Sequence, residues 1–372
     1  MAALVVVLLA LAGLAAGGWY YSERLRSGAL EPDREKDELD LQVVAVEDGS
    51  VTLRAARGLV TSGDWKSDGT FGLEWEQGYG QVGAVLEMDN EQVARSFVPL
   101  RGTLKVGDLV RLDSFAFPGD PRQAHGMPFR EVTFASELGE LSAWFVEGEG
   151  DVWVILVHGR GADRREALRI LPALVERGFP ALVITYRNDV GAPRSPDGFY
   201  HFGHTEWKDL EAAANFAVRQ GAEWLVLVGY SMGGAIVTNF LYQSPLADRV
   251  EAVVLDAPML DFNAVLNREA QEMGVPGILT EAGKATARFR FGFDPGELNY
   301  LKRADELDAP ILLFHGDADP TVPVGTSDAL AEARPDIVTY VRVPGAGHVR
   351  SWNAGPAAYE EAVRKFLGRL DR

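Results

Sequence analysis

The chain of 372 residues contains no cysteine. Disulfide bonds, thiolate metal sites and a cysteine nucleophile are therefore excluded. Basic residues are also few, because 36 lysines and arginines stand against 54 acidic residues, which leaves a net charge of −18. A surface this acidic repels phosphate backbones, so the sequence predicts no nucleic-acid partner. The length is that of roughly two folding units.

The first segment lacks charge altogether. Residues 2–18 read AALVVVLLALAGLAAGG, and three aromatic residues follow before the first charge at Glu23. An apolar run of roughly 18 or more residues can span a bilayer as a helix, and aromatic residues favour its interface end. Residues 1–22 are therefore predicted to form a single membrane anchor.

A cleaved signal peptide, which would leave a secreted protein, is the alternative. Ala10-Leu11-Ala12 fits the small-x-small cleavage pattern. No lysine or arginine precedes the apolar run, although a signal peptide normally carries one there, so the anchor is preferred. Arg24 and Arg26 leave open which side of the membrane the rest of the chain occupies.

Charged and turn-forming stretches divide the next part of the chain. The run EPDREKDELD at 31–40 predicts a solvated linker over residues 23–38, and a Pro-Gly-Asp-Pro break opens a second linker over residues 118–129. Residues 39–117 between them are predicted to be a small β-rich domain without a catalytic motif. Its expected strands are Leu41–Val46, Ser50–Ala55, Phe71–Trp75, Gln81–Met88, Gln92–Val98 and Leu109–Phe117.

From residue 130 to residue 372, strands alternate with helices. Two antiparallel strands come first, and near-continuous apolar strands then alternate with helical stretches, which predicts a doubly wound, mostly parallel α/β sheet. Residues of about 260–305 interrupt this rhythm after a strand and are predicted to form a short helical cap, with helices near Asn263–Met273 and Ala282–Arg290. The expected strands are Glu131–Ala135, Leu141–Val146, Val152–Val157, Ala181–Thr185, Trp224–Val228, Val250–Leu255, Ile311–Phe314 and Val338–Val343; the helices are Arg164–Arg177, Glu206–Gln220, Met232–Gln243, Thr326–Ala333 and Pro356–Leu370.

A candidate nucleophile stands between one of these strands and a helix. The stretch Gly229–Gly233 reads GYSMG and matches G-x-S-x-G in the strand–turn–helix context that the motif requires. A side chain at Gly229 or Gly233 would crowd the sharp turn that presents the hydroxyl of Ser231. A chance match in a chain with 40 glycines is the alternative, and the partners found downstream make it much the weaker one.

Two backbone N–H groups are needed to stabilise the oxyanion of an acyl-transfer reaction. One is expected from Met232, which follows the serine. The other is expected from Arg160, in the loop VHGRG that ends the first long buried strand, where Gly159 lets the backbone approach the substrate. His158 is expected to organise this loop rather than to take part in chemistry.

The candidate acid and base follow the last two strands. His348 lies in a Gly-rich loop after residues 338–343 and is the expected general base. Asp319 is the preferred acid. Asp317, in the same loop, is the alternative, and Asp256 is a weaker third candidate. The order Ser231, Asp319, His348 is the chain order of the triad in α/β-hydrolases.

These residues together resemble the α/β-hydrolase superfamily over roughly residues 130–372. The matching pieces are the His158-Gly159 loop, the GYSMG motif, the HGDADPTV stretch at 315–322, and Gly347-His348. The resemblance implies that Asp319 is the triad acid and that the enzyme uses no cofactor. The nearest groups are bacterial esterases, lipases and S9/S33-like peptidases.

Three other patterns are weaker. His204 and Asp209 have the H-x-x-x-x-D spacing of glycerolipid acyltransferases, but Asp209 is expected to be an acid that the dipole of its helix favours. His201 and His204 lack a third ligand nearby, so no metal site is expected. The stretch 187–189, Arg-Asn-Asp, either lines the substrate pocket or shapes a polar loop.

The leading hypothesis is therefore a serine hydrolase of small or medium carboxylic esters that acts through an acyl-enzyme. The partners expected are a small-molecule ester or acyl substrate and the membrane. A serine peptidase or a thioesterase is the alternative, and the additional β-rich domain is consistent with a peptidase. A non-catalytic membrane-tethered binding protein is the weakest hypothesis, because such a protein has no need of three placed catalytic groups.

Overall fold

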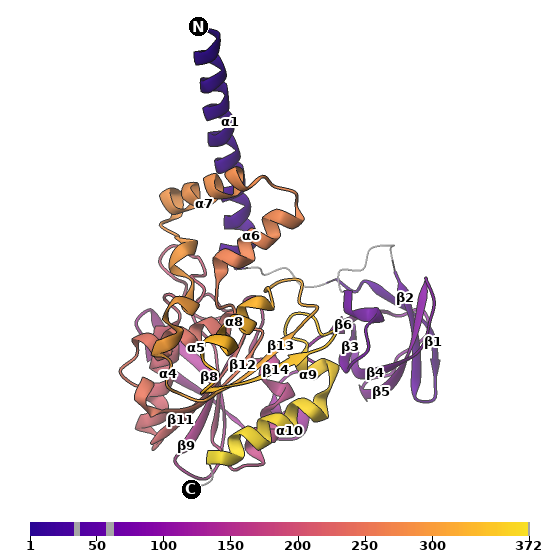
Figure 1. The fold of residues 1–372 in the computed structure, drawn as a ribbon. Helices are drawn as coiled ribbons and strands as arrows, with labels where there is room; N and C mark the ends of the chain where they lie inside the picture. Colours follow the sequence, from indigo (N-terminus) through magenta and orange to yellow (C-terminus); the bar gives the residue numbers. More distant parts are fainter. Residues whose placement is uncertain (33–37, 57–62, 371–372) are drawn as a thin grey trace.

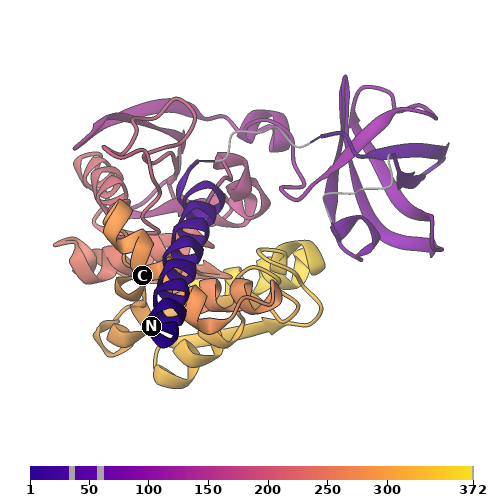
Figure 2. The same ribbon diagram turned by 90° about the horizontal axis from the view of Figure 1, so that it is seen from above.

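The computed structural model describes residues 1–32, 38–56 and 63–370. A small barrel and a larger α/β body lie side by side, and helix α1 (Ala2–Leu25) projects from the body (Figure 1). Seen along α1, the barrel stands away to one side of the helix and the body lies beneath it (Figure 2). Part of the predicted linker, residues 33–37, lies outside the described residues.

The N-terminal strands close into a barrel of six antiparallel strands in the order β1-β2-β5-β4-β3-β6. Successive side chains of a strand point to opposite faces, so one face of each strand fills the interior with residues such as Val43, Leu53, Phe71 and Val82. The strands are β1 (Leu41–Glu47), β2 (Ser50–Ala55), β3 (Phe71–Trp75), β4 (Gly78–Met88), β5 (Gln92–Arg101) and β6 (Leu109–Asp113).

Strand β6 ends four residues earlier than the sequence predicted. The Asp113 side chain accepts a hydrogen bond from the backbone N–H of Phe115 at 3.0 Å, which is a local alternative to the strand ladder. A short helix, α2 (Pro121–His125), follows in the predicted linker, and the Asp120 carboxylate caps its N-terminus.

The body contains the predicted mostly parallel sheet, with eight strands in the order β14-β13-β12-β11-β9-β10-β8-β7. Only β8 and its neighbours pair antiparallel, and the strands from β10 to β14 pair parallel. The strands are β7 (Arg130–Ser136), β8 (Gly139–Val146), β9 (Val152–Val157), β10 (Ala181–Ile184), β11 (Trp224–Tyr230), β12 (Val250–Asp256), β13 (Ile311–Gly316) and β14 (Val338–Val343).

Helices cover both faces of this sheet. Residues of β9 alternate between two hydrophobic clusters: one includes α4, α5 and α8, and the other includes α3 and α10. The near-continuous apolar sequence of the strands follows from this burial on both sides. The helices are α3 (Leu171–Val175), α4 (Trp207–Arg219), α5 (Met232–Gln243), α8 (Gly325–Ala333), α9 (Ser351–Ala354) and α10 (Pro356–Leu367).

The helix predicted over residues 164–177 is interrupted. Residues Arg164–Arg169 form a 3₁₀ helix, and α3 begins only at Leu171. Pro172 explains the break, because proline lacks the N–H that would continue the ladder and its ring restricts the preceding residue.

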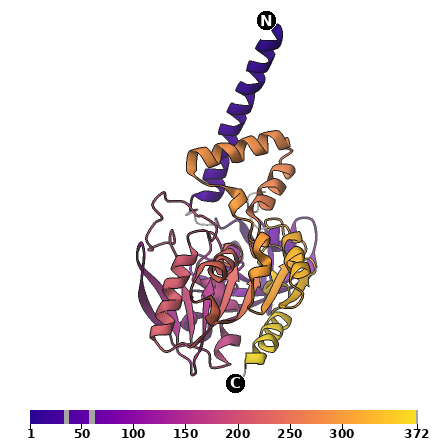
Figure 3. The same ribbon diagram turned by 60° about the vertical axis from the view of Figure 1, so that its left-hand side comes forward.

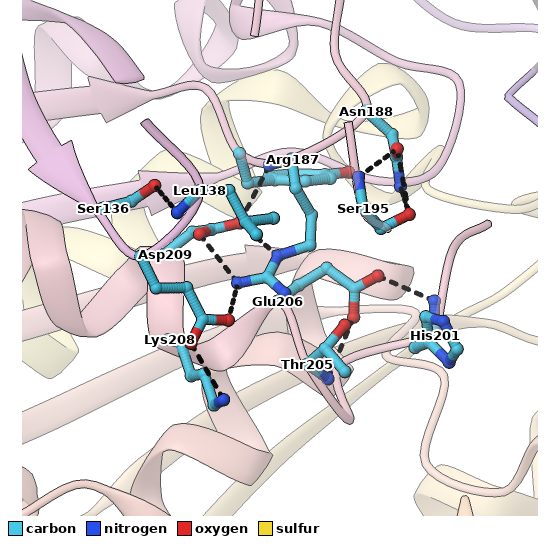
Figure 4. Close-up of polar contacts among 12 residues, drawn as sticks. Ser136, Leu138, Arg187, Asn188, Ser195, His201, Thr205, Glu206, Lys208 and Asp209 are labelled. Carbon is cyan, nitrogen blue, oxygen red and sulfur yellow. Dashed lines mark hydrogen bonds and ion pairs between the residues drawn. The ribbon is translucent and has the colours of Figure 1, made fainter. Parts of the chain in front are cut away.

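The segment between β10 and α4 is held by buried polar contacts (Figure 4). The Arg187 guanidinium donates to both carboxylate oxygens of Asp209, at 2.7 and 2.9 Å, and both side chains are almost fully buried. Asp209 is therefore the partner of a buried cation rather than only an acid near a helix dipole. The Glu206 carboxylate accepts from the backbone N–H groups of His201 and Gly203, at 2.7 and 2.9 Å.

Between β12 and β13 the chain forms the predicted helical insertion, with α6 (Phe262–Glu272) and α7 (Gly277–Phe291). Helix α7 crosses α1 near the point where α1 meets the body (Figure 3). Helix α1 runs past the predicted end at residue 22, and a π-helical turn, Arg26–Leu30, continues it. Leu30 is fully buried in the core of the body, so the segment predicted as the start of a linker is partly helical and packed.

Candidate active site

Ser231 lies between the end of β11 and the start of α5, with the positive backbone φ of 49° that L-residues rarely adopt. The two glycines of the motif have no room for a side chain. A Cβ at Gly233 would lie 2.2 Å from the carbonyl oxygen of Val157, and one at Gly229 would lie 2.6 Å from the carbonyl oxygen of Gly233. The serine is thus held on a strained turn at the carboxyl end of the sheet.

The fold brings the three predicted catalytic residues together from separate loops. Ser231 Oγ lies 2.8 Å from His348 Nε2, and His348 Nδ1 lies 2.7 Å from Asp319 Oδ2. At these distances the hydroxyl can pass its proton to the imidazole, and the carboxylate can orient the imidazole ring. His348 is partly exposed, whereas Asp319 is buried.

The Asp319 carboxylate accepts hydrogen bonds from several groups besides His348. Its Oδ1 accepts from the backbone N–H groups of Thr321 and Val322, at 2.7 and 2.9 Å, and its Oδ2 lies 3.1 Å from His315 Nε2. Burial alone would raise the pKa of Asp319, but the hydrogen bonds from His315 and His348 outweigh it and hold this pKa well below its usual value. The carboxylate is therefore ionised whenever the protein is folded near neutral pH.

The loop after β9 packs against Ser231. Gly159 packs so closely that a Cβ there would lie 3.2 Å from Ser231 Cβ, and its N–H donates to Glu166 at 2.8 Å. His158 is buried, with Nε2 2.9 Å from Asp189 Oδ2 and Nδ1 2.9 Å from the Gly159 carbonyl oxygen. The ring of His158 also stacks on Tyr186. His158 is thus placed to hold the loop and is not in the proton path.

The contact between His158 and Asp189 predicts a pH-dependent stability. Burial lowers the pKa of His158, but the Asp189 carboxylate more than offsets this and raises it to about 9. The unfolded value is about 6.5, so the stabilisation of about 3 kcal/mol is full below pH 6.5 and is lost as the pH rises through 9. Urea unfolding at pH 6 and pH 9.5 should show this loss. In Asp189→Asn the difference should largely vanish, and an unchanged difference in that variant would contradict the assignment.

The two residues predicted to supply oxyanion donors flank the serine. Met232 is buried at the first position of α5, and Arg160 follows Gly159 on the wall opposite. The Arg160 guanidinium turns toward the N-terminal segment, where Nη2 donates to the Gly28 carbonyl oxygen at 2.6 Å. The side chain of Arg160 thus joins the loop after β9 to the N-terminal segment.

Ser231 and His348 open into a cleft of about 1300 Å³ between the body and the barrel. Phe71, Trp75 and Asp113 of the barrel form part of its wall, as do residues 38–40 ahead of β1. Among the described lining residues, nine carboxylates stand against five arginines. The ionisable side chains of the cleft are thus net acidic, and they lie among apolar side chains such as Phe115 and Trp144.

The barrel also contacts the segment that carries His348. Arg350, two residues after His348, donates from Nε to Asp64 at 2.8 Å and from Nη1 to the His348 carbonyl oxygen at 3.0 Å. Asn353 is fully buried, and its Nδ2 donates to the carbonyl oxygens of Thr70 and Ser114. The barrel therefore helps to set the position of the loop that holds His348.

The other candidates from the sequence lie in different places. Asp317 accepts from the backbone N–H of Gly345 at 2.7 Å and shapes the loop, and Asp256 is buried against Ser351 Oγ at 2.7 Å. Asn188 and Asp189 line the cleft. Ring atom Nε2 of His201 lies 2.9 Å from Asp197. Within residues 1–32, 38–56 and 63–370, no group of three or more acidic or histidine side chains is arranged to hold a metal ion.

Three supporting residues had no signal in the sequence: Glu166, Arg350 and Asn353. Each acts through a partner far along the chain or through a backbone group, so no spacing rule identifies it. His315 was visible only as part of the HGDADPTV stretch, and its contact with Asp319 depends on how that loop folds.

Two family models match different parts of the chain. Residues 154–303 match the model of the alpha/beta hydrolase family, and residues 42–113 match a domain of unknown function. A dipeptidyl aminopeptidase, BIII, of Pseudoxanthomonas mexicana is 26% identical over 53% of this chain and 30% of that protein. The chain thus spans less than a third of that relative's length. The uncharacterized protein YfhR of Escherichia coli K12 is 23% identical over 70% of this chain and 86% of that protein.

Solved structures resemble the body of the chain. An esterase of Pyrococcus furiosus aligns with a TM-score of 0.54 and 20% identity, covering 68% of this chain and 95% of that one. The mouse alpha/beta hydrolase domain-containing protein 10 aligns with a TM-score of 0.51 and 17% identity, covering 66% of this chain and all of that one. At such identities these structures establish a shared fold and nothing about substrate.

Proposed function

We propose that this chain, a member of the α/β-hydrolase superfamily, is a serine hydrolase that cleaves carboxylic esters through an acyl-enzyme on Ser231. The observation that carries the proposal is the continuous path from Ser231 Oγ through the His348 ring to Asp319, with contacts of 2.8 and 2.7 Å. The open cleft beside the hydroxyl supports it, because a substrate carbonyl can reach the serine there.

In the proposed mechanism, Ser231 Oγ attacks the ester carbonyl carbon while its proton passes to His348 Nε2. His348 then returns this proton to the leaving alkoxide as the carbon–oxygen bond breaks. A water molecule then attacks the acyl carbon while its proton passes to His348 Nε2. His348 returns this proton to Ser231 Oγ as the acyl–oxygen bond breaks, which releases the carboxylic acid. The Asp319 carboxylate holds the Nδ1–H tautomer of His348, and the backbone N–H groups of Met232 and Arg160 stabilise the oxyanion.

The charged side chains in the cleft restrict the length and polarity of the acyl group that we propose for the substrate. A long aliphatic acyl chain would have to displace water from carboxylates and guanidinium groups, which is unfavourable without compensating partners. Short or polar acyl groups avoid this desolvation penalty. We therefore propose small or medium acyl groups, as esters or thioesters.

A peptidase is the second candidate, and one observation favours it. The barrel forms a wall of the cleft, with Trp75 and Asp113 among the lining residues, so that an extended chain would have to pass between barrel and body. The net acidic lining suits a substrate with a free amine.

A matched series of substrates separates the two candidates. We expect hydrolysis of p-nitrophenyl acetate and butyrate to exceed that of the corresponding p-nitroanilides, and the ester kcat/KM to fall from butyrate to laurate. Aminoacyl anilides turned over faster than the matching aminoacyl esters would favour the peptidase. Ester hydrolysis that rises steadily to laurate would contradict the charged-cleft argument.

We further propose that α1 is retained as a single-pass membrane anchor. Among the described residues it is the one helix long and apolar enough to span a bilayer, and 6% of its apolar window is buried. Its last turns pack on the body: Ser22 is fully buried and accepts from Arg290 Nη1 at 2.8 Å. These contacts favour retention over release as a signal sequence.

A further inference from the structure

The contacts of α1 with the body determine how deep the body would lie against a bilayer. Leu14 is partly buried, and close packing begins at Gly17, where a Cβ would lie 2.7 Å from Leu279, and at Gly18, where one would lie 2.6 Å from Thr286 Oγ1. The exposed part before it, residues 2–13, is only about 18 Å long at 1.5 Å per residue. A hydrocarbon core of about 30 Å therefore extends past it, to the level of residues 19–21.

Helix α7 crosses α1 at this same level (Figure 3). A Cβ at Gly283 of α7 would lie 2.9 Å from Tyr21 Cβ, and the Arg290 guanidinium lies 3.7 Å from the ring centre of Trp19. Trp19 and Tyr20 remain more than half exposed, at 59% and 56%. Exposed aromatic rings are typical of the boundary between hydrocarbon and headgroups.

The outer face of α7 carries an apolar stripe that no other part of the described chain covers, with the exposed side chains of Glu281 and Arg288 beside it. Ile278 is 64% exposed and Phe289 is 91% exposed, and Ala285 between them is also exposed. Spacings of seven and eleven residues are about two and three turns, so the three side chains share one face. Gly283 and Ala287, about half a turn around the helix from Phe289, are buried against the rest of the protein.

The charge of α7 is opposite to that of the whole protein. The helix contains Lys284, Arg288 and Arg290 against the single acid Glu281, within a chain whose net charge is −18. Lys284 is largely buried and paired with Glu281, Arg290 is largely buried and paired with Glu23, and only Arg288 is exposed, where it pairs with Asp294. An exposed apolar stripe beside an exposed basic side chain is typical of a helix that lies in the surface of a membrane.

We propose that α7 is an interfacial membrane helix, which lies in the headgroup layer with Ile278, Ala285 and Phe289 toward the acyl chains. Together with α1 it forms a second, non-parallel attachment, so the body is held in one orientation rather than rotating about a single tether. The proposal requires that α1 is retained, and it is independent of the hydrolase activity.

Because the chain has no cysteine, a single introduced cysteine carries a unique spin label. We would label Ile278→Cys and Phe289→Cys in the full-length chain, in nanodiscs of mixed zwitterionic and anionic lipid with one chain per disc. Leu9→Cys in α1 is the reference for the bilayer interior, and Glu361→Cys, exposed on α10, is the reference for water. All four side chains are exposed or lie outside the packed core, so the fold should be unchanged.

The measurement is the ratio of label relaxation by molecular oxygen, which concentrates in the bilayer, to relaxation by a water-soluble nickel chelate. We expect the ratio at 278 and 289 to exceed that at 361 by at least threefold and to stay below that at 9. Ratios at 278 and 289 equal to that at 361 would overturn the proposal. Protection from both reagents, seen only in discs that hold two chains, would overturn it in favour of a second copy. Loss of the Leu9 label by cleavage would also overturn it.

Discussion

Replacing Ser231 with alanine is expected to abolish ester hydrolysis, with kcat lower by roughly 10⁴- to 10⁶-fold. The residual rate reflects the oxyanion donors and substrate binding, which the variant keeps. Covalent labelling by a fluorophosphonate probe should disappear as well, because the probe reacts only with an activated hydroxyl. Alanine keeps the Cβ and the backbone strain at φ 49°, so the melting temperature should stay close to that of the unaltered protein.

The matched control is Ser114→Ala. Ser114 lines the same cleft, and its backbone carbonyl, not its hydroxyl, accepts the hydrogen bond from Asn353. This variant should hydrolyse esters and react with the probe as the unaltered protein does. Equal labelling of Ser231→Ala and the unaltered protein would remove Ser231 as the nucleophile and, with it, the proposed acyl-enzyme.

Replacing Asp319 with asparagine is expected to lower kcat by roughly 10⁴-fold while KM changes little. Asparagine can still accept the backbone hydrogen bonds of Thr321 and Val322 through its carbonyl oxygen, so the loop should keep its shape. It loses the charge that stabilises the His348 imidazolium, and its amide presents N–H where His348 Nδ1–H needs an acceptor. The effect should therefore appear in the chemical step rather than in binding.

Two further carboxylates serve as controls for the choice of Asp319. Asp317→Asn should retain most activity, because Asp317 contacts the Gly345 backbone and not the His348 ring. Asp256→Asn should likewise act mainly on stability, because Asp256 contacts Ser351 behind the site. A loss of kcat in either variant comparable to the loss in Asp319→Asn would show that the acid had been misassigned.

The barrel contributes to the proposed active site in two ways. It forms a wall of the cleft, and through the pair of Arg350 with Asp64 it contacts the segment next to His348. A ligand that binds between barrel and body would thus contact both the wall of the cleft and Arg350, which lies next to the loop of His348. The barrel, whose sequence matches a domain of unknown function, thus contacts the proposed active site at two places.

Much of the secondary structure and the three candidate catalytic residues followed from local patterns. Apolar runs of strand length, alternating with amphipathic stretches, predicted the parallel sheet, since burial on both faces requires continuous apolar strands. Gly229 and Gly233 predicted the turn at Ser231, because any Cβ there meets backbone oxygen. Such signals are readable because they arise from backbone geometry within a few residues.

What the sequence left open depended on contacts between distant segments. Closure of β1 onto β6 makes a barrel of the predicted β-rich domain, and no local pattern specifies that pairing. The burial of Leu30 is likewise decided by neighbours far along the chain. The tertiary structure alone brings His315 and His348 to one carboxylate oxygen, and α7 to the base of α1, because each contact needs both partners in place.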